Sequence, residues 1–285
     1  MTASAEIMTI QTTAETAFAK INLALHVRSR RADGYHLIES LFAFVDDGDR
    51  VEAAPASELS LHLTGPFAGE LDGGGDNLVL RAARAMQAHF GVGKGAVILL
   101  DKRLPVAAGL GGGSTDAAAA ARALNRLWCL DADEAALTAA IGALGADVPA
   151  CLASRTLIGR GIGDEMAPHA GAAALTGRPV LLVNPRIACP TGPVYRQWDG
   201  VDRGPLGEDA ANWRNDLEPG ALALVPPIAA VLEALRGMAG AEMVRMSGSG
   251  ATCFALFGDV AARGGAERAI ARAHPGWWTM TGALR

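Results

Sequence analysis

The sequence predicts an α+β protein built as two lobes. Segments that alternate apolar and polar residues, as half-buried strands do, are interleaved with segments whose apolar residues recur at helical spacing. The chain has 285 residues, half of them apolar, which suffices for one large or two medium domains. A stretch rich in glycine and alanine, 159–177, separates the two halves. We therefore expect an N-terminal lobe over 1–168 and a C-terminal lobe over 169–285.

The N-terminal lobe is expected to open with two strands. Residues 17–27 alternate between an apolar face and a face that carries Lys20 and Asn22, which is the period of a half-buried strand. A turn over 28–35 contains an Asp-Gly pair, which supplies the backbone freedom that a turn needs. The apolar segment 37–45 then predicts the second strand.

Helices and a further strand follow in the same lobe. Residues 76–90 carry an apolar stripe at helical spacing, with Asp76 placed to cap the helix. A short buried strand is predicted at 97–100, followed by a glycine-rich turn at 109–113 and an alanine-rich helix at 115–128.

A third helix should start near Asp131, because Asp131 and Glu134 have the spacing of an Asp-x-x-Glu variant of the capping box. Gly145 suits the C-terminal cap of that helix. The second lobe is expected to contain a strand at 180–183, a helix at 228–238, and two paired strands at 243–245 and 251–257.

Composition and charge exclude several classes of protein. The net charge of −5 argues against a nucleic-acid-binding protein, since such proteins need a basic surface. The four cysteines are far apart with no CxxC pair, which disfavours a zinc site or a disulfide framework. Residues 1–13 do not have the pattern of a signal peptide, and no stretch approaches the ~20 apolar residues that span a bilayer. We expect a cytoplasmic protein without nucleic-acid or membrane partners, and its oligomeric state is left open.

Residues 105–116, PVAAGLGGGSTD, follow a predicted strand and open a predicted helix. The glycines let backbone amides approach an anion closely, and the helix directs its free N–H groups and positive dipole end to the same place. Ser114 and Thr115 add hydroxyls for phosphate oxygens or a metal ion. The combination predicts a di- or triphosphate site. The alternative is a glycine-rich turn without a ligand, which would cost backbone entropy for no packing gain.

Two other phosphate-binding motifs do not fit. A Walker A loop requires GxxxxGK[ST], and the nearest candidate, Gly93-Lys94, is followed by Gly95. The dinucleotide motif GxGxxG would start at Gly109, but Ser114 stands where the third glycine belongs. This disfavours a nicotinamide-dependent oxidoreductase.

Residues 105–114 resemble the signature phosphate loop of the GHMP kinases. Within that superfamily, 19–23 (AKINL) followed by 31–36 (RADGYH) resembles the N-terminal block of the diphosphocytidyl-methylerythritol kinases. Residues 145–149 (GADVP) resemble their catalytic aspartate segment, and 246–251 (MSGSGA) resemble the third superfamily motif. The blocks occur in family order and span most of the chain, so their joint occurrence is highly specific.

The resemblance implies a two-lobed GHMP fold, with an N-terminal lobe like domain 2 of ribosomal protein S5 and a ferredoxin-like C-terminal lobe. It implies a transferase that uses ATP and Mg²⁺, with Ser114 as the candidate protein ligand to the metal. The implied ATP-binding residues are Pro105, Val106, Ala107, Ala108, Gly109, Leu110, Gly111, Gly112, Gly113, Ser114 and Thr115, with Asn77, Leu78 and Lys102 at the adenine. One departure lies at Ser114-Thr115-Asp116, where many members carry a second serine and then asparagine, although Thr115 keeps the hydroxyl.

Lys20 and Asp147 are the implied catalytic pair. From the residues alone, Asp147 reads more readily as a turn or capping aspartate before Val148-Pro149, and Lys20 as a solvated lysine of a strand. The resemblance reverses both readings. Asp147 then accepts the proton of the attacking hydroxyl, and Lys20 keeps that aspartate ionised and stabilises the developing alkoxide.

The implied substrate is a small molecule, diphosphocytidyl-methylerythritol, phosphorylated on its 2-hydroxyl in the non-mevalonate route to isoprenoid precursors. Tyr35 and Tyr195 would sandwich its cytosine and His36 would read the edge of the base, although from the residues alone both tyrosines read as core aromatics. The implied substrate-binding residues are Asn22, Tyr35, His36, Thr191, Tyr195 and Gly248, with Thr191 and Tyr195 in a stiff extended loop.

Two alternatives stay open at this point. The first is another GHMP kinase, acting on homoserine or a mevalonate-type alcohol, which the 31–36 turn and Tyr195 disfavour. The second is a non-catalytic nucleotide-binding regulator on the same fold, which the presence of both Lys20 and Asp147 disfavours.

Overall fold

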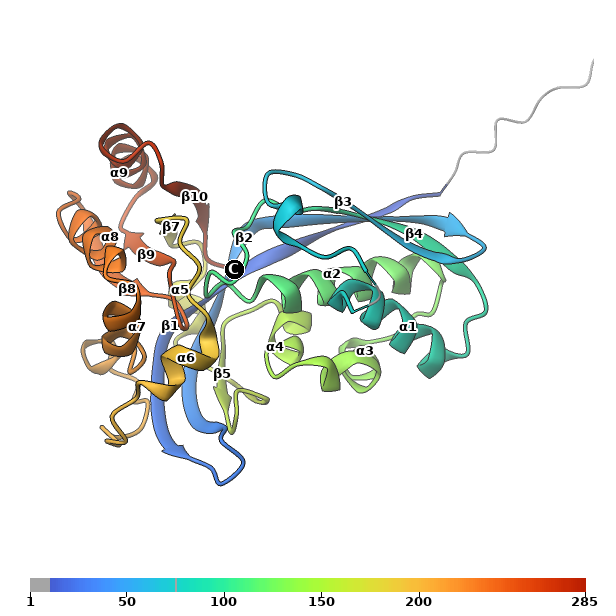
Figure 1. The fold of residues 1–285 in the computed structure, drawn as a ribbon, viewed down its shortest axis with the longest axis horizontal. Coiled ribbons are helices and arrows are strands. Elements are labelled where there is room, and N and C mark those ends of the chain that lie inside the picture. The colour runs from blue at the N-terminus through green and yellow to red at the C-terminus, as the bar shows by residue number, and fades with distance from the viewer. Residues whose placement is uncertain (1–10, 75) are drawn as a thin grey trace, which may run out of the picture.

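The computed structural model describes residues 11–74 and 76–285, which form two sheets (Figure 1). The first sheet has the order β3-β4-β2-β5-β6, with β1 paired to β2, and the second has the order β10-β7-β9-β8. The strands of the first sheet are β1 (Thr13–Arg30), β2 (His36–Ala56), β3 (Leu59–Thr64), β4 (Gly95–Asp101), β5 (Leu157–Arg160) and β6 (Glu165–Pro168). Those of the second are β7 (Pro179–Asn184), β8 (Ala241–Met246), β9 (Cys253–Phe257) and β10 (Trp278–Ala283).

The helices fall into two sets, one for each half of the chain. Those of the first lobe gather on one face of the first sheet (Figure 1) and are α1 (Leu78–Phe90), α2 (Gly112–Leu127), α3 (Glu134–Ile141) and α4 (Val148–Ala153). The later helices are α5 (Ala172–Leu175), α6 (Thr191–Arg196), α7 (Glu218–Leu224), α8 (Pro227–Arg236) and α9 (Val260–Ala273). The predicted α+β fold with two lobes is confirmed. In the described part of the chain, no helix is long and apolar enough to cross a membrane.

The break between the two sheets falls where the sequence predicts the lobe boundary. Strand β6 ends at Pro168 and β7 begins at Pro179. The short strands β5 and β6 lie in or next to the glycine-rich stretch and were not predicted. The division into lobes at 168/169 stays a prediction. The prediction that residues 1–13 are not a signal peptide concerns a segment that lies mostly outside the described residues.

Strand β1 is buried on both faces over residues 19–27, so the prediction of a half-buried strand was wrong. Its Ala19, Ile21 and Leu23 pack with Leu182 and Phe254 of the second sheet. Farther along, Leu25 and Val27 join the core beneath α8. The polar positions between them turn towards the cleft or into hydrogen-bonded networks. The two lobes therefore share an apolar core built on β1.

Three local predictions were displaced by a few residues. Helix α1 is capped by Asn77, whose side chain accepts from Val79 N, and not by Asp76. Asp133, and not Asp131, caps α3 by accepting from Ala136 N. Gly145 follows a one-turn 3₁₀ helix that extends α3, so it does not end α3 itself. Several polar residues stood near each helix start, and spacing alone did not choose between them.

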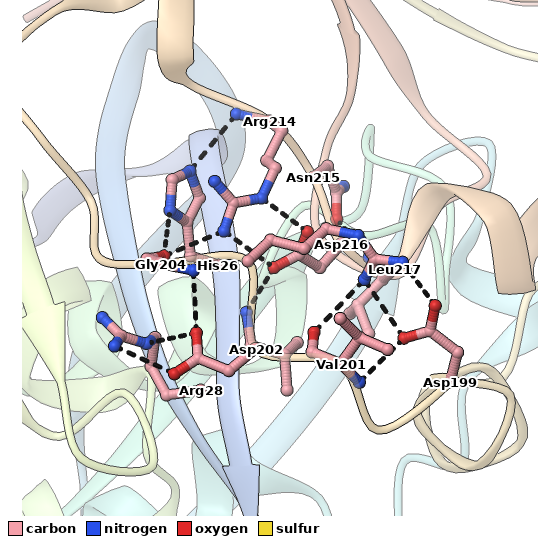
Figure 2. Close-up of polar contacts among 12 residues, drawn as sticks. His26, Arg28, Asp199, Val201, Asp202, Gly204, Arg214, Asn215, Asp216 and Leu217 are labelled. Atoms are coloured by element: carbon pink, nitrogen blue, oxygen red, sulfur yellow. Dashed lines mark hydrogen bonds and ion pairs between the residues drawn. The ribbon is translucent and has the colours of Figure 1, made fainter.

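The segment 199–217 crosses from α6 to α7 and is fastened to β1 by side chains (Figure 2). Asp216 accepts from Val27 N and from Arg214 Nε, both at 2.8 Å. Leu25 N donates to Arg214 O, and Asp216 N donates back to Leu25 O. Asn215 continues this connection towards the third motif, because its amide donates to Met246 O and Gly248 O at 2.9 and 2.8 Å.

His26 lies fully buried in this network as a neutral ring (Figure 2). Arg214 N donates to its Nε2 at 3.4 Å, which places the ring proton on Nδ1, 3.3 Å from Gly204 O. Burial, followed by the charge of Arg214, lowers the pKa of His26 from its usual 6.5. Protonation would direct a second ring N–H at the donor of Arg214.

We predict that His26 makes the fold acid-sensitive. Its pKa is lower in the folded than in the unfolded state, so stability is fully present above pH 6.5 and is lost as pH falls below that value. Melting temperatures of wild type and His26→Gln at about pH 8 and about pH 5 test this. The loss on acidification should be smaller in the variant. An equal loss in both proteins would contradict it.

Candidate active site

A cleft of about 820 Å³ lies between the two lobes. It is lined by β1 and the turn that follows, by the loop before α2, by Asp147, by α6 and by the third motif. A smaller hollow of about 240 Å³ adjoins it near Leu78 and Gly113. The cleft therefore brings together the sequence blocks that carried the resemblance.

The phosphate loop enters α2 earlier than predicted, because the helix begins at Gly112 and not at 115. Gly111 is its N-cap with φ +66°, in the left-handed region that favours glycine. Gly109 has φ +75°, and a side chain there would overlap the carbonyl oxygen of Ser247. Ser114 accordingly lies in the first turn of α2, with its hydroxyl group available to the cleft.

Three backbone carbonyl groups of the loop, those of residues 108–110, accept hydrogen bonds from residues outside the loop. Thr252 N donates to Ala108 O at 3.1 Å, Ser247 Oγ to Gly109 O at 2.8 Å, and Lys20 N to Leu110 O at 3.1 Å. In the described part of the chain, the N–H groups of 106–111 donate no backbone hydrogen bond. A loop whose carbonyls are occupied and whose amides are unused is suited to bind an anion.

Most of the predicted ATP-binding residues line the cleft, but Leu110, Thr115 and Asn77 do not. Leu110 is buried in the apolar core shared with β1. Thr115 is also buried, and its hydroxyl donates to Gly112 O at 2.9 Å, a bond within the helix. The cleft-lining members are Pro105, Val106, Ala107, Ala108, Gly109, Gly111, Gly112, Gly113, Ser114, Leu78 and Lys102.

Lys20 and Asp147 meet in the cleft, with Lys20 Nζ 2.9 Å from Asp147 Oδ2. Lys20 is buried, and its ammonium lies 4.7 Å from the centre of the Phe42 ring, so it is not the solvated lysine of the alternative reading. Asp147 precedes α4 without making a capping hydrogen bond in the described structure, and its side chain is 33% exposed. A carboxylate that is partly open and held by one buried cation can accept a proton from a bound hydroxyl.

The aromatic residues gather where the cleft is lined by the turn after β1 and by α6. His36 packs against Tyr195 with ring centres 5.0 Å apart, while Tyr35 is 61% exposed beside them. Burial, followed by the charge of Arg30, lowers the pKa of His36, which keeps the ring neutral. Burial, with the charge of Asp147 acting in the same direction, raises the pKa of the Tyr195 hydroxyl and keeps it protonated.

Trp198 completes this aromatic group and was not predicted. Its ring meets His36 edge-on at 5.6 Å. The extended loop predicted around Thr191 and Tyr195 is in fact α6, because Pro193 falls in the first turn, where a missing N–H is tolerated. Tyr195 and Trp198 are three residues apart, one helical turn, and that spacing was the signal that a helical reading would have used.

Asn22 directs an unused acceptor at the cleft. Its Nδ2 donates to Ser40 Oγ at 2.7 Å and its backbone N to Ser247 Oγ at 3.2 Å. Among the described residues, Asn22 Oδ1 has no partner although the residue is only 2% exposed. Gly248 leaves the space next to this oxygen open, because the Cβ of any other residue at that position would lie 3.3 Å from Asn22 Oδ1. A ligand hydroxyl or amine would satisfy this oxygen.

Thr191, Asn77 and Lys102 each carry structural bonds as well as a place near the site. Thr191 Oγ1 and Ser249 Oγ are 3.0 Å apart at the cleft wall. Asn77 lines only the smaller hollow and caps α1. Lys102 lines the cleft, but its ammonium is held by Asp49 and Asp116.

Comparison with known proteins places these features in a family. The model described as the GHMP kinases N terminal domain matches residues 77–155, and that described as GHMP kinases C terminal matches 201–276. A protein of Sphingopyxis alaskensis named 4-diphosphocytidyl-2-C-methyl-D-erythritol kinase is 52% identical over 279 residues, covering 95% of this chain and 98% of the relative. One of the same name from Novosphingobium aromaticivorans is 54% identical over 276 residues, covering 95% and 92%.

Solved structures give the same grouping. A crystal structure of 4-(cytidine 5'-diphospho)-2C-methyl-D-erythritol kinase matches with a TM-score of 0.79 at 36% identity, covering 95% of this chain and 98% of that chain. A homoserine kinase from Cytophaga hutchinsonii matches with a TM-score of 0.72 at 18% identity, covering 99% and 98%. The second match shows the shared fold alone.

Proposed function

The chain belongs to the 4-diphosphocytidyl-2-C-methyl-D-erythritol kinase family, within the GHMP kinases, and from that premise we propose how its cleft works. The chain is a kinase that transfers a phosphoryl group from ATP to 4-diphosphocytidyl-2-C-methyl-D-erythritol. The acceptor in our proposal is the 2-hydroxyl. The ion pair of Lys20 and Asp147 between the phosphate loop and the aromatic group is the observation that carries the assignment.

In the proposed reaction Asp147 accepts the proton of the attacking hydroxyl. Lys20 lies 2.9 Å from Asp147 and orients its carboxylate, and the same ammonium stabilises the alkoxide as it develops. Phosphoryl transfer has a loose transition state, so the protein contributes mainly by positioning and electrostatics. The backbone bond from Lys20 N to Leu110 O ties the catalytic lysine to the phosphate loop.

The phosphates of ATP are placed on the amides of 106–113 at the N-terminus of α2. Magnesium, when bound, neutralises charge on the phosphates. The described residues contain no group of three or more His, Cys, Asp or Glu side chains that could hold a metal. That fits an ion held largely by the nucleotide with few protein ligands, of which the Ser114 hydroxyl is our candidate.

The cytidine is placed at the aromatic end, between the rings of Tyr35 and Tyr195. A neutral His36 has one ring nitrogen that donates and one that accepts, which suits the edge of a cytosine. Asn22 Oδ1 then accepts from the erythritol part of the substrate. Substrate residues thus come from both lobes, with Thr191 and Tyr195 from the second. This aromatic group favours a cytidine nucleotide as the substrate over homoserine or mevalonate. The cytoplasmic location of the protein stays a prediction.

The proposed function is tested by measuring ADP release with each of three acceptors: the diphosphocytidyl compound, homoserine and mevalonate. Only the first should support release above background, and added CMP should compete with it and not with ATP. Release that depends on homoserine or mevalonate instead would place the chain among the other GHMP kinases.

We predict that Tyr195→Leu raises KM for the diphosphocytidyl substrate by about 10- to 100-fold, the value of one base-stacking contact. KM for ATP should stay near the wild-type value, because the ring of Tyr195 packs against His36 and not against the phosphate loop. Tyr195→Phe is the matched control, since it keeps the ring and should keep KM. Steady-state kinetics with each substrate varied in turn would check this, and equal KM values for wild type and Tyr195→Leu would contradict it.

A further inference from the structure

Lys102 is a buried cation between two buried carboxylates. Its Nζ lies 2.5 Å from Asp49 Oδ2 and 2.7 Å from Asp116 Oδ2. Asp49 is fully buried, and Lys102 and Asp116 are each 2% exposed. Charges removed from water in this way are costly unless they are paired, so the three side chains are bound into one unit.

The three members come from different elements. Asp49 belongs to β2, Lys102 follows β4 directly, and Asp116 lies in the second turn of α2. Asp49 Oδ1 also accepts from the backbone N–H groups of Arg103 and Leu104, at 2.5 and 2.8 Å. The chain is therefore pinned to β2 immediately before the phosphate loop starts at Pro105.

Lys102 also joins the two ends of that loop. Residues 105–115 leave the sheet after Leu104 and return as helix α2, and the bond from Lys102 to Asp116 closes the base of this excursion. The ammonium reaches the loop closely, because a Cβ on Gly112 would lie only 3.0 Å from Lys102 Nζ. Lys102 therefore lies against the first turns of α2, where the phosphate loop ends.

Both carboxylates are needed to keep the buried ammonium of Lys102 charged. Burial alone lowers the pKa of Lys102, but Asp116 and Asp49 outweigh it and the pKa is raised. Burial raises the pKa of Asp116, whereas the charge of Lys102 acts against that shift. In the described part of the chain Asp116 Oδ1 has no partner, and Asp116 lines both the cleft and the smaller hollow.

We propose that the Asp49–Lys102–Asp116 unit is a clamp that positions the phosphate loop, and that Lys102 acts on ATP binding through the loop rather than as a wall of the adenine pocket. This inference rests on the proposed function, because it assigns the loop to ATP. Lys102 is thus a positioning residue. The clamp sets where the amides of 106–113 stand before nucleotide binds.

The test compares Lys102→Met with Lys94→Met, the same change at an exposed lysine outside the cleft. In the assay of ADP release, Lys102→Met should raise KM for ATP by about 10- to 100-fold, the usual effect of a small displacement of binding groups. KM for the diphosphocytidyl substrate should change by less than about twofold, because the hydrogen bonds and ion pairs of the clamp in the described structure involve none of Tyr35, His36 and Tyr195. Lys94→Met should leave both KM values unchanged.

A second variant separates positioning from folding. Lys102→Met alone leaves two carboxylates facing each other, whereas Lys102→Met with Asp116→Asn removes one of those charges. The double variant should recover most of the melting temperature and yet keep the raised KM for ATP. Recovery of melting temperature and KM together would reduce the clamp to a structural role and overturn the proposal. Unchanged KM for ATP in a folded Lys102→Met protein would also overturn it.

Failure of the proposed function has a different signature. Binding of a non-hydrolysable ATP analogue to wild type, followed by calorimetry, reports on the loop without any acceptor. If wild type binds the analogue and Lys102→Met binds it about 10-fold or more weakly, the clamp is supported even when the acceptor proves to be another alcohol. Equal affinities for the analogue in the two proteins would overturn the clamp even when the acceptor is correct.

Discussion

Asp147→Asn should lower kcat for ADP release by about 100-fold or more, the usual contribution of a positioned general base. An amide cannot accept the proton of the attacking hydroxyl, but it keeps the size of the carboxylate and can still contact Lys20. KM for both substrates should therefore change little, since the phosphate loop and the aromatic group are untouched. Steady-state kinetics on the purified variant measures both effects.

Asp131→Asn is the matched control for this prediction. Asp131 is exposed, lies outside the cleft and sits at φ +49°, a conformation that asparagine tolerates at least as well. That variant should keep full activity. A kcat for Asp147→Asn within about fivefold of wild type would contradict the general-base assignment.

Lys20→Met should lower kcat by about 100- to 1000-fold, the range seen when one preorganised group that stabilises developing charge is removed. The methionine keeps the apolar stem that lies beside Phe42 and removes only the ammonium. Lys20→Arg should not restore activity, because a planar guanidinium presents its donors differently from the compact ammonium that lies 2.9 Å from Asp147. Lys94→Met serves as the control, and near-normal kcat in Lys20→Met would contradict the role of the ammonium.

The two substitutions should also be non-additive. Asp147 and Lys20 are bonded at 2.9 Å and act in one proton transfer, so the double variant should be no slower than the slower single variant within about threefold. Independent effects that multiply would mean that the two residues serve separate steps.

The sequence predicted the site better than the packing around it. Lys20 and Asp147 are far apart in the chain and could be paired only through the motif blocks, and the structure places them in contact. The period of 17–27 predicted a strand, but it could not show that β1 is covered on both faces, because that depends on the second sheet. Local pattern reports one element at a time, whereas burial depends on its neighbours.

The missed features share a physical cause. Asp49, which completes the clamp, lies beyond the predicted strand 37–45, and only the longer β2 paired with β4 places it beside Lys102. Trp198 was missed because the segment around Thr191 and Tyr195 was predicted to be an extended loop, although proline is compatible with a first helical turn. Lys102 was assigned to the adenine pocket because sequence position says nothing of ion pairs across strands.

The most direct test of the account is to identify the product that forms from ATP, magnesium and 4-diphosphocytidyl-2-C-methyl-D-erythritol. Wild type should yield ADP and the acceptor with one added phosphate, with the phosphorus coupled to the 2-position carbon in the nuclear magnetic resonance spectrum. Asp147→Asn should yield that product about 100-fold more slowly or not at all. A phosphate on a different hydroxyl, or no product from well-folded wild type, would contradict the proposed chemistry of this cleft.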